Sequence, residues 1–555
     1  MPAPASSIVQ STAMTRLKRR TLISILALAG LAALLAALHN FRAKRALRAF
    51  KAELIAKGEK LTIEEMTPPA HPEAQRAAND LMQAAWELRV GLVIPNNLPR
   101  AMGSIAPGKA SVGWKQSGIC DTNKTNTWDE LAEDLKMNAA ALDQIREALR
   151  SPQFDMNLNY KTGFNVALGS ALGSLARYKS VAQWLSVATL NALHAGRLND
   201  AATNLNALLS LVNASRDEKL IICQLVRIAI AAIGIPPTWE ALQADGWTDA
   251  QLASIQQRWA ALEFLQPMEQ ASAMERAIGI EMFDRLRNSS VERRQWFSGN
   301  LFGGPAVTPG TPAPTNIAEV PDFALEWSKE RLSSLNSFAQ ENAWRWFWSY
   351  DDELRYVQTL QIMLEVPRRA RLTGSFASAR SRGTDEIWRH RHLGDLGFVR
   401  YFLSDMLAPA MEKASAKAAR LEVQREMIVT AIALKRYSLR HGKPAPTLAA
   451  LVPEFLPQTP KDLIDGQPLR YRPRADGGFL LYSVNEDAKD DGGDPRPTSP
   501  VSQNYSLGNG RDMVWPMPAT AAEIAEAHAR ETKRIPTAQL FPLVKSTNAA
   551  PTAAK

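Results

Sequence analysis

The sequence predicts a mainly α-helical protein with an N-terminal transmembrane helix, a body of helical hairpins, and a small C-terminal α+β module with a short antiparallel sheet. Residues 21–38 form an uncharged apolar run. After residue 127, apolar residues recur mostly at spacings of three and four, which is the helical period. Near residues 469–472 apolar and polar side chains alternate instead, which is typical of strands.

These patterns divide the chain into six segments. We predict a cytoplasmic basic N-terminus (1–20), a transmembrane signal-anchor (21–38), a stalk helix (39–65), a helical body (66–404) with loop insertions near 95–127 and 302–321, an α+β module (405–517), and a polar helix with a disordered tail (518–555).

Length and composition narrow the class of protein. The chain has 555 residues, which is too long for one typical core, and its hydrophobic fraction of 46% is ordinary for globular proteins. The net charge is +9, and much of the positive charge flanks the apolar run, which favours a membrane over nucleic acid as partner. The basic and aromatic strand pattern of an RNA-binding sheet is missing from the sequence, so we expect no nucleic-acid partner.

The two cysteines are Cys120 and Cys223, far apart in the sequence. So few cysteines exclude a disulfide-dense scaffold and a cysteine-based zinc site. One disulfide and two buried free thiols remain equally compatible with the sequence.

The apolar run TLISILALAGLAALLAAL at 21–38 is just long enough to cross a hydrocarbon core of ~30 Å as a helix. It is compatible with an uncleaved signal-anchor, a cleaved signal peptide or a soluble apolar helix. The following sequence, HNFRAKR, lacks the small residues of a cleavage site, which favours the signal-anchor. Basic residues on both flanks nearly cancel the orientation rule. Because a short basic N-terminus precedes a large body, we expect a single-pass inner-membrane protein, embedded in the lipid bilayer through 21–38, with its bulk in the periplasm.

The stalk, 39–65, keeps a helical rhythm and carries many basic residues. It is compatible with a helix lying on anionic headgroups and with a solvated linker helix.

Within the body, several helix boundaries follow from capping residues. Thr127, with acidic residues after it, is predicted to cap a helix, and residues 181–215 read as two antiparallel helices that meet near Gly196, with Asn199 or Asp200 capping the second. The segment 218–235 is almost wholly apolar but holds Glu218, Lys219, Gln224 and Arg227, which favours a core helix over a second membrane helix.

Two further patterns in the body leave alternatives open. Trp344 and Trp348 lie four apart, and Phe347 and Tyr350 three apart, so they form two stripes of a helix that either bind a sugar or partner, or pack in the core. His390 and His392 suit a metal if they lie on a strand, but no third ligand stands nearby, and a polar surface turn is the simpler interpretation.

The C-terminal module begins with a long helix over 408–440, ended by Gly442, and a second short helix is expected at PTLAALVPEFL. LRYRPRADGGFLLYSV then predicts a β-hairpin with ADGG as its turn. The hairpin is followed by an acidic run, Glu486 to Asp494, with five carboxylates in nine positions. Carboxylates in a flexible loop suit calcium, but the EF-hand template fails because Lys489 falls on a ligand position.

This part of the chain resembles the C-terminal domain of the major pseudopilin of type II secretion systems. Family-like elements run from the long helix to the sequence RDMVWP. They are Tyr437, Gly442 and Pro446 around the helix end, then Asp462, Asp465, Gly466, Pro468 and Tyr471 at the hairpin, then Ser483, Asp487, Gly492 and Gly493 in the acidic loop, and finally Asp512 and Trp515.

The resemblance implies a calcium ion that orders the acidic loop. Its implied ligands are Ser483, Asp487 and Asp512, with Asp490, Asp491 and Asp494 as weaker candidates.

The chain departs from the family pattern at several places. Asn485 replaces a glycine, Leu463 replaces a proline, and the apolar run lacks the preceding glycine and the glutamate of a pilin peptidase site. The resemblance covers about a sixth of the chain and therefore implies a fold, not membership of a pilus. As a whole, the chain looks like large membrane-anchored envelope proteins of the planctomycete–verrucomicrobial type, whose activity is not established.

The sequence contains no G-x-S-x-G elbow, Walker A loop, H-E-x-x-H motif or dinucleotide fingerprint, and no catalytic residue is assigned. We therefore expect a non-enzymatic envelope protein with a structural or protein-interaction role. The alternatives are an envelope hydrolase with its site in the helical body, and an accessory component of a type II secretion or pilus-like machine.

Overall fold

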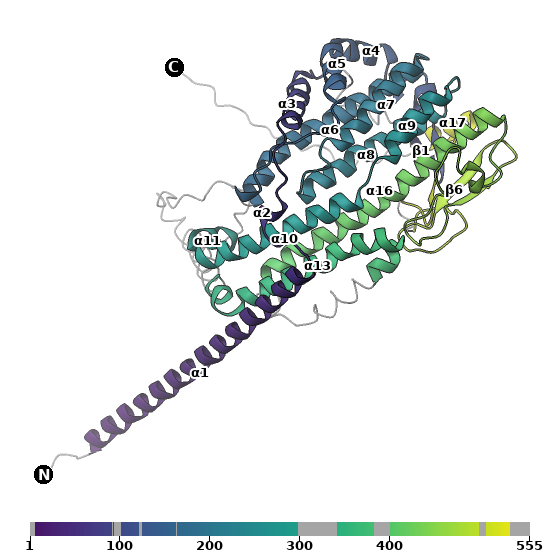
Figure 1. Ribbon diagram of the computed structural model, residues 1–555. Helices are drawn as coiled ribbons and strands as arrows, with labels where there is room; N and C mark the ends of the chain where they lie inside the picture. Colours follow the sequence, from purple (N-terminus) through teal and green to yellow (C-terminus); the bar gives the residue numbers. More distant parts are fainter. Residues whose placement is uncertain are drawn as a thin grey trace, which may run out of the picture.

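The computed structural model is a mainly helical body from which one long helix projects (Figure 1). It describes residues 6–91, 93, 102–120, 125–162, 164–297, 341–381, 400–498 and 507–532. The prediction of a mainly helical chain with a small C-terminal sheet is confirmed. The predicted loop at 302–321, the His390/His392 pair and the tail beyond residue 532 lie outside the described residues.

The helices of the body follow one another along the chain, most of them with short connections. Before the long insertion they are α2 (Ile63–Met66), α3 (Pro72–Glu87), α4 (Trp128–Met137), α5 (Ala139–Ala148), α6 (Phe164–His194), α7 (Leu198–Asn213), α8 (Ile221–Leu242), α9 (Asp249–Ala260), α10 (Leu265–Asn288) and α11 (Ser290–Phe297). After it come a π-helical turn, η4 (Trp344–Trp348), then α13 (Ser349–Thr373), α16 (Phe402–His441) and α17 (Ala521–Thr532).

Capping explains some of these boundaries and not others. Thr127 begins α4 as predicted, because its hydroxyl accepts the backbone N–H of Glu130 while Glu130 accepts the N–H of Thr127. Gly196 lies between α6 and α7 with φ of +71°, also as predicted. The predicted caps of the second helix are wrong, since α7 already begins at Leu198 and lacks a side-chain cap.

Helix α1 (Ser6–Ala56) spans 51 residues and has two different halves. Its C-terminal half buries Ala43, Leu47 and Leu54 against α13 and η4. The part of the predicted stalk that lies in α1 therefore packs as a helix of the body. It is not a solvated linker, and only its exposed faces are free to contact headgroups. The half before it projects away from the body (Figure 1), and its described leucines are exposed.

Helix α8 lies in the core, as predicted for residues 218–235. It packs against α6, α7, α10 and α16, and more than half of it is buried. Among the described residues it is the one helix long and apolar enough to cross a membrane. Its core position follows from its polar residues, since the buried Gln224 and Arg227 both find hydrogen-bond partners inside the body.

Helix α16 has 40 residues, which gives it a length of about 60 Å. It contacts α13 and α10 at one end, α8 and α9 along its length, and the C-terminal sheet at the other (Figure 1). It begins before the predicted start at 408 and ends at Gly442, whose φ of +68° is the left-handed cap expected there. The helix that opens the predicted 405–517 module thus shares one hydrophobic core with the body.

The strands form three small sheets. In the C-terminal module, β5 (Arg470–Pro473), β6 (Phe479–Ser483) and β7 (Met513–Val514) form an antiparallel sheet that contains the predicted hairpin. The expected helix at PTLAALVPEFL is only a single 3₁₀ turn, η5 (Leu448–Leu451).

The predicted loop at 95–127 contains strands and a short helical turn. They are β1 (Gly103–Ala106), β2 (Lys109–Ser111), η1 (Gly113–Lys115), β3 (Ile119–Cys120) and β4 (Thr125–Asn126). Strand β2 pairs in parallel with β8 (Met517–Pro518), which joins residues some 400 positions apart. The prediction of a plain surface loop at 95–127 is therefore wrong, because β1 and β2 form a hairpin that the distant β8 extends, and β3 pairs with β4.

Candidate functional site

The acidic run lies in a long connection between β6 and β7, beside the C-terminal end of the sheet. Strand β6 ends at the buried Ser483, and the chain then turns at Asn485 and Ala488, both with φ of +57°. Asparagine tolerates the left-handed conformation better than most residues, which suits it to this turn. The turn moves Glu486 and Asp487 to the surface.

Asp512 is the organising residue of this connection. Its Oδ2 accepts the backbone N–H groups of Gly493 (2.7 Å) and Asp494 (3.1 Å), and its Oδ1 accepts that of Asp491 (3.4 Å). Gly493 has φ of +83°, and a Cβ there would lie 3.1 Å from the Leu480 side chain, so a glycine is needed for this approach. Burial raises the pKa of Asp512, while the three N–H donors oppose that rise.

Asp462 is a second carboxylate that accepts backbone N–H groups, next to strands β5 and β6. It is fully buried and accepts the backbone N–H groups of Ile464 and Val484, both at 3.0 Å, and a guanidinium N–H of Arg470 at 3.0 Å. Arg470 also pairs with Asp465 at 2.5 Å and lies 3.4 Å from Asp490. Burial raises the pKa of Asp462. One arginine therefore gathers three carboxylates and ties the β5 strand to the loops around it.

The predicted calcium ligands are spread over different environments. Ser483 is buried, with its Oγ 3.3 Å from the backbone N of Asn485, whereas Asp487 is exposed and accepts the N–H of Lys489. Asp512 faces the turn at 491–494. In the described part of the chain, no hydrogen bond or ion pair joins these three residues, and no group of three or more His, Cys, Asp or Glu side chains could hold a metal ion.

The weaker candidates are also occupied in other ways. Asp490 accepts the Gly492 N–H at 2.9 Å, which lowers its pKa, and also the Tyr482 hydroxyl at 3.1 Å. Asp494 forms a two-pronged pair with Arg496, which lowers the pKa of Asp494. Asp491 is exposed and contributes its backbone N–H to Asp512. The donors that face Asp512 and Asp494 are N–H groups, so this arrangement does not fit a cation held by the predicted set.

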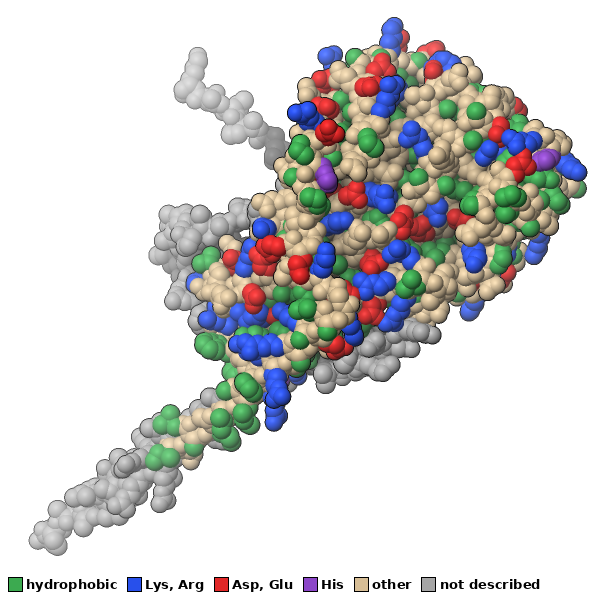
Figure 2. Space-filling model, viewed as in Figure 1, with side chains coloured by type: hydrophobic (Ala, Val, Ile, Leu, Met, Phe, Trp, Pro, Cys, Tyr) green, Lys and Arg blue, Asp and Glu red, His purple; other side chains and the backbone are tan. Residues whose placement is uncertain are grey.

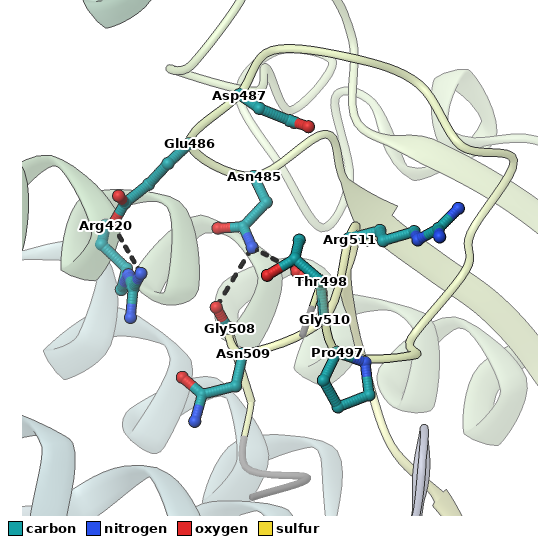
Figure 3. Close-up of a pocket in the computed structure, with 10 residues that line it drawn as sticks. All are labelled: Arg420, Asn485, Glu486, Asp487, Pro497, Thr498, Gly508, Asn509, Gly510 and Arg511. Carbon is teal, nitrogen blue, oxygen red and sulfur yellow. Dashed lines mark hydrogen bonds and ion pairs between the residues drawn. The ribbon is translucent and has the colours of Figure 1, made fainter. Parts of the chain in front are cut away.

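A cavity of about 380 Å³ opens beside this loop (Figure 3). Its floor is Asn485, whose amide N–H groups donate to the carbonyls of Gly508 (3.1 Å) and Gly510 (2.7 Å). Asn485 is 7% exposed, and its Oδ1 lacks a hydrogen-bond partner in the described structure. At the rim, Arg420 pairs with Glu486 at 2.5 Å. The cavity is small and polar, and its charged groups are partly neutralised by each other.

Buried carboxylates elsewhere were not predicted as a group. Glu240 accepts the backbone N–H groups of Met102 and Gly113, both at 2.7 Å, and thereby holds the 102–113 segment on α8. Asp352 accepts those of Leu403 (3.1 Å) and Ser404 (3.0 Å), and Glu422 accepts that of Phe264 at 2.6 Å. The only sequence signal for them is an acidic residue within an apolar helical pattern, which does not reveal the distant partner.

Three buried carboxylates have raised pKa values. Burial raises the pKa of Glu240 to about 7, that of Glu275 to about 7 and that of Asp352 to about 6. Such values suit acid–base catalysis, but the side chains face backbone N–H groups of the core. The free thiol Cys223 is also buried, and burial raises its pKa, so it is an inert packing residue. The three carboxylates therefore hold neighbouring segments of the body together.

Comparisons of the chain with models of protein families, with curated proteins and with solved structures find no match.

Proposed function

We propose that the protein is a membrane-anchored, non-enzymatic protein of the cell envelope with a structural or protein-interaction role. One observation carries the proposal: the projecting half of α1 exposes its apolar side chains. Leu26, Leu31, Leu34, Leu35 and Leu38 are 48–63% exposed, and Phe41 is 66% exposed. Water is a poor solvent for such a row, whereas a bilayer is a good one.

The charge pattern around α1 supports the same proposal. Figure 2 shows hydrophobic side chains along the projecting part and Lys and Arg side chains where the helix meets the body. This order is typical of a helix that leaves a bilayer. We place the anchor at residues 21–38, in the inner membrane, with the body on the periplasmic side. The side chains of residues 21 and 22 and several others in this span lie outside the described residues.

The architecture of the body supports an interaction role. One core connects the part of the body at α1 to the C-terminal sheet, and α16 runs between them. The buried acids Glu240, Asp352 and Glu422 tie segments together by accepting backbone N–H groups. The C-terminal module, which resembles that of a pseudopilin, would present its loops at the end of the body farthest from the membrane.

The anchor is tested by charge substitutions in the full chain. The double variant Leu31→Arg/Leu35→Arg places two charges in the span, at a cost of about 3 kcal/mol each. We expect the wild type to stay in the membrane pellet after carbonate washing and the variant to be released. The matched control is Ile55→Arg, on the same helix and 61% exposed, which should remain in the pellet. Equal retention of wild type and double variant would exclude the anchor.

The role of the body is tested separately. Protease treatment of spheroplasts should digest the body if it lies in the periplasm, and should spare it if it lies in the cytoplasm. Labelling of the purified chain with broad hydrolase probes distinguishes the envelope hydrolase, because specific labelling would contradict a non-enzymatic role. Purification of intact complexes with type II secretion components would instead support the accessory-component alternative.

A further inference from the structure

A cleft lies where α1 enters the body. It has a volume of about 520 Å³ and lies between one face of α1, from Ala36 to Lys44, and the aromatic turn η4. The two sides are joined by polar contacts, since the Asn40 side chain donates to the Trp346 carbonyl at 2.9 Å, and His39 lies 2.6 Å from Asp351. These contacts fix the geometry of the cleft without filling it.

The η4 turn presents aromatic rings to the surface beside α1. It is π-helical, with the Ser349 N–H bonded to the Trp344 carbonyl, so one extra residue is inserted in the helix. Trp344 is buried, and its indole N–H donates to Asp352 at 2.7 Å. Trp346 and Phe347 are 59% and 38% exposed. The sequence pattern suggested core packing or a binding face, and the π-helical turn provides both, because it buries Trp344 and exposes the next two rings.

Positive charge surrounds the same cleft. Lys44 lies with its ammonium 5.3 Å from the centre of the Tyr350 ring, and Arg345 lies over Trp346 at 5.0 Å. Arg45 and Arg48 are exposed on α1, one helical turn after Phe41 and Lys44 of the cleft, and none of the carboxylates in the described residues pairs with them or with Lys44. Elsewhere on the body most exposed arginines have acidic partners. The cations beside the cleft do not, which makes them candidates to bind a negatively charged ligand.

The position of the cleft along α1 identifies the ligand. It begins at Ala36, at the end of the apolar run, so a bilayer that holds residues 21–38 has its headgroup layer at the cleft. Tryptophan and tyrosine favour this layer, because their rings are amphipathic, and lysine and arginine near it attract anionic lipids. An acidic protein would not account for the exposed Trp346 and Phe347 at this depth.

We propose that the cleft between α1 and η4 binds an anionic phospholipid of the surrounding bilayer. Lys44 pairs with the headgroup phosphate, Trp346 and Phe347 lie among the glycerol and upper acyl groups, and Arg45 and Arg48 contribute to the attraction. The body thereby docks on the membrane in a fixed orientation, with α16 leading away from it. This inference rests on the proposed membrane anchor.

The test measures lipids retained by the full chain in detergent. Purified protein is mixed with equal amounts of phosphatidylglycerol and phosphatidylcholine, and the bound lipids are counted by native mass spectrometry. We expect phosphatidylglycerol to be retained over phosphatidylcholine, and inorganic phosphate alone not to be retained. The variant Lys44→Gln should lower phosphatidylglycerol retention about fivefold, the value of one cation near the membrane surface. Trp346→Ala should lower the retention of both lipids.

A matched control comes from the far side of the body. Arg177 stacks on the exposed Trp86 at 3.7 Å, which is the same pair of groups away from α1. Arg177→Gln and Trp86→Ala should leave retention unchanged, and all variants should melt with the wild type. Equal retention of the two lipids, or unchanged retention in Lys44→Gln, would overturn the lipid site. These variants keep the span intact, so a failure of the site leaves carbonate-resistant pelleting in place, whereas a failure of the anchor abolishes pelleting in the wild type.

Discussion

Helices α1 and α8 are the two long apolar segments of the chain, and they have opposite fates. The apolar side chains of α8 lie in the core, whereas those in the projecting half of α1 are exposed. The difference lies in the few polar residues: α8 carries Gln224, Arg227 and Glu240, all buried and all hydrogen-bonded, whereas residues 21–38 carry neither a charge nor an amide.

A buried polar group is therefore a marker of a protein environment. It can be satisfied only where other segments bring partners to it, and lipid offers none. Arg227 shows the principle, since it donates to the carbonyls of Val212 (2.9 Å) and Glu263 (2.6 Å) and to the Asn213 side chain (3.3 Å). Substitutions that each remove one feature test this contrast between the two helices and its counterpart in the C-terminal loop.

The largest effect is expected from Arg227→Met, which keeps an unbranched stem but is shorter and removes the donors. Three acceptors lose their partner, two of them backbone carbonyls, and we expect the free energy of unfolding to fall by about 4 kcal/mol. Urea unfolding followed by circular dichroism measures it. The control is Arg42→Met on α1, which is exposed and pairs with none of the described carboxylates, and which should change stability by less than about 0.5 kcal/mol. Similar losses in both variants would contradict the contrast.

Features that depend on nearby residues could be predicted from the sequence, whereas features that depend on distant residues could not. Thr127, Gly196 and Gly442 act within one helical turn of their own position, so local spacing revealed them. The core position of α8 was also predictable, because its polar residues interrupt an apolar helix. The pairing of Lys109 with Met517 and the hold of Asp512 on residues 491–494 depend on segments brought together only by the whole fold. No local pattern encodes such partners. The grouping of Asp512 with Asp487 followed from the resemblance to a pseudopilin module, and within the described residues the recorded partners of Asp512 are instead the N–H groups of residues 491–494.

The next effect concerns the other end of α8, where Glu240 holds the 102–113 segment. Its folded pKa of about 7 lies above the ordinary value of 4.5, so the folded state binds the proton more tightly. The resulting stabilisation is complete below about pH 4.5 and is lost as pH rises through about 7, an amount of about 3 kcal/mol. Unfolding experiments from pH 5 to 8 should show this slope.

The variant Glu240→Gln keeps an acceptor for both N–H groups and cannot titrate, so its slope should be flatter than that of the wild type. Glu275 and Asp352 retain their own raised pKa values and leave a residual slope. The exposed Glu87→Gln serves as control and should follow the wild type. A Glu240→Gln profile that overlays the wild-type profile would show that Glu240 is not the group responsible.

A smaller effect is expected in the C-terminal loop, where Asp512 repeats the role of Glu240 closer to the surface. Asp512→Ala frees three N–H groups, which partly regain water, and should lower stability by about 2 kcal/mol. Asp487→Ala is the matched control and should have little effect, because Asp487 is exposed and bonds only within its own turn.

The same pair of variants tests calcium, which remains a hypothesis for this loop. If calcium ordered it, a chelator would lower the melting temperature of the full chain, and Asp487→Ala would abolish the dependence on calcium. We expect the melting temperature to be the same with chelator and with millimolar calcium. A calcium-dependent shift that requires both Asp487 and Asp512 would restore the predicted site and imply that the loop rearranges when the ion binds.

The smallest effect on stability is expected in the projecting half of α1. Leu34→Ala should change the free energy of unfolding by less than about 0.5 kcal/mol in detergent, because Leu34 is 57% exposed. Leu208→Ala, in the core beside α8, should cost about 2–5 kcal/mol, because Leu208 is fully buried. The two substitutions are chemically identical, so their ratio measures only the environment. A loss above about 1 kcal/mol in Leu34→Ala would mean that protein covers this part of α1, and the most direct candidate for that protein is α1 of a second copy.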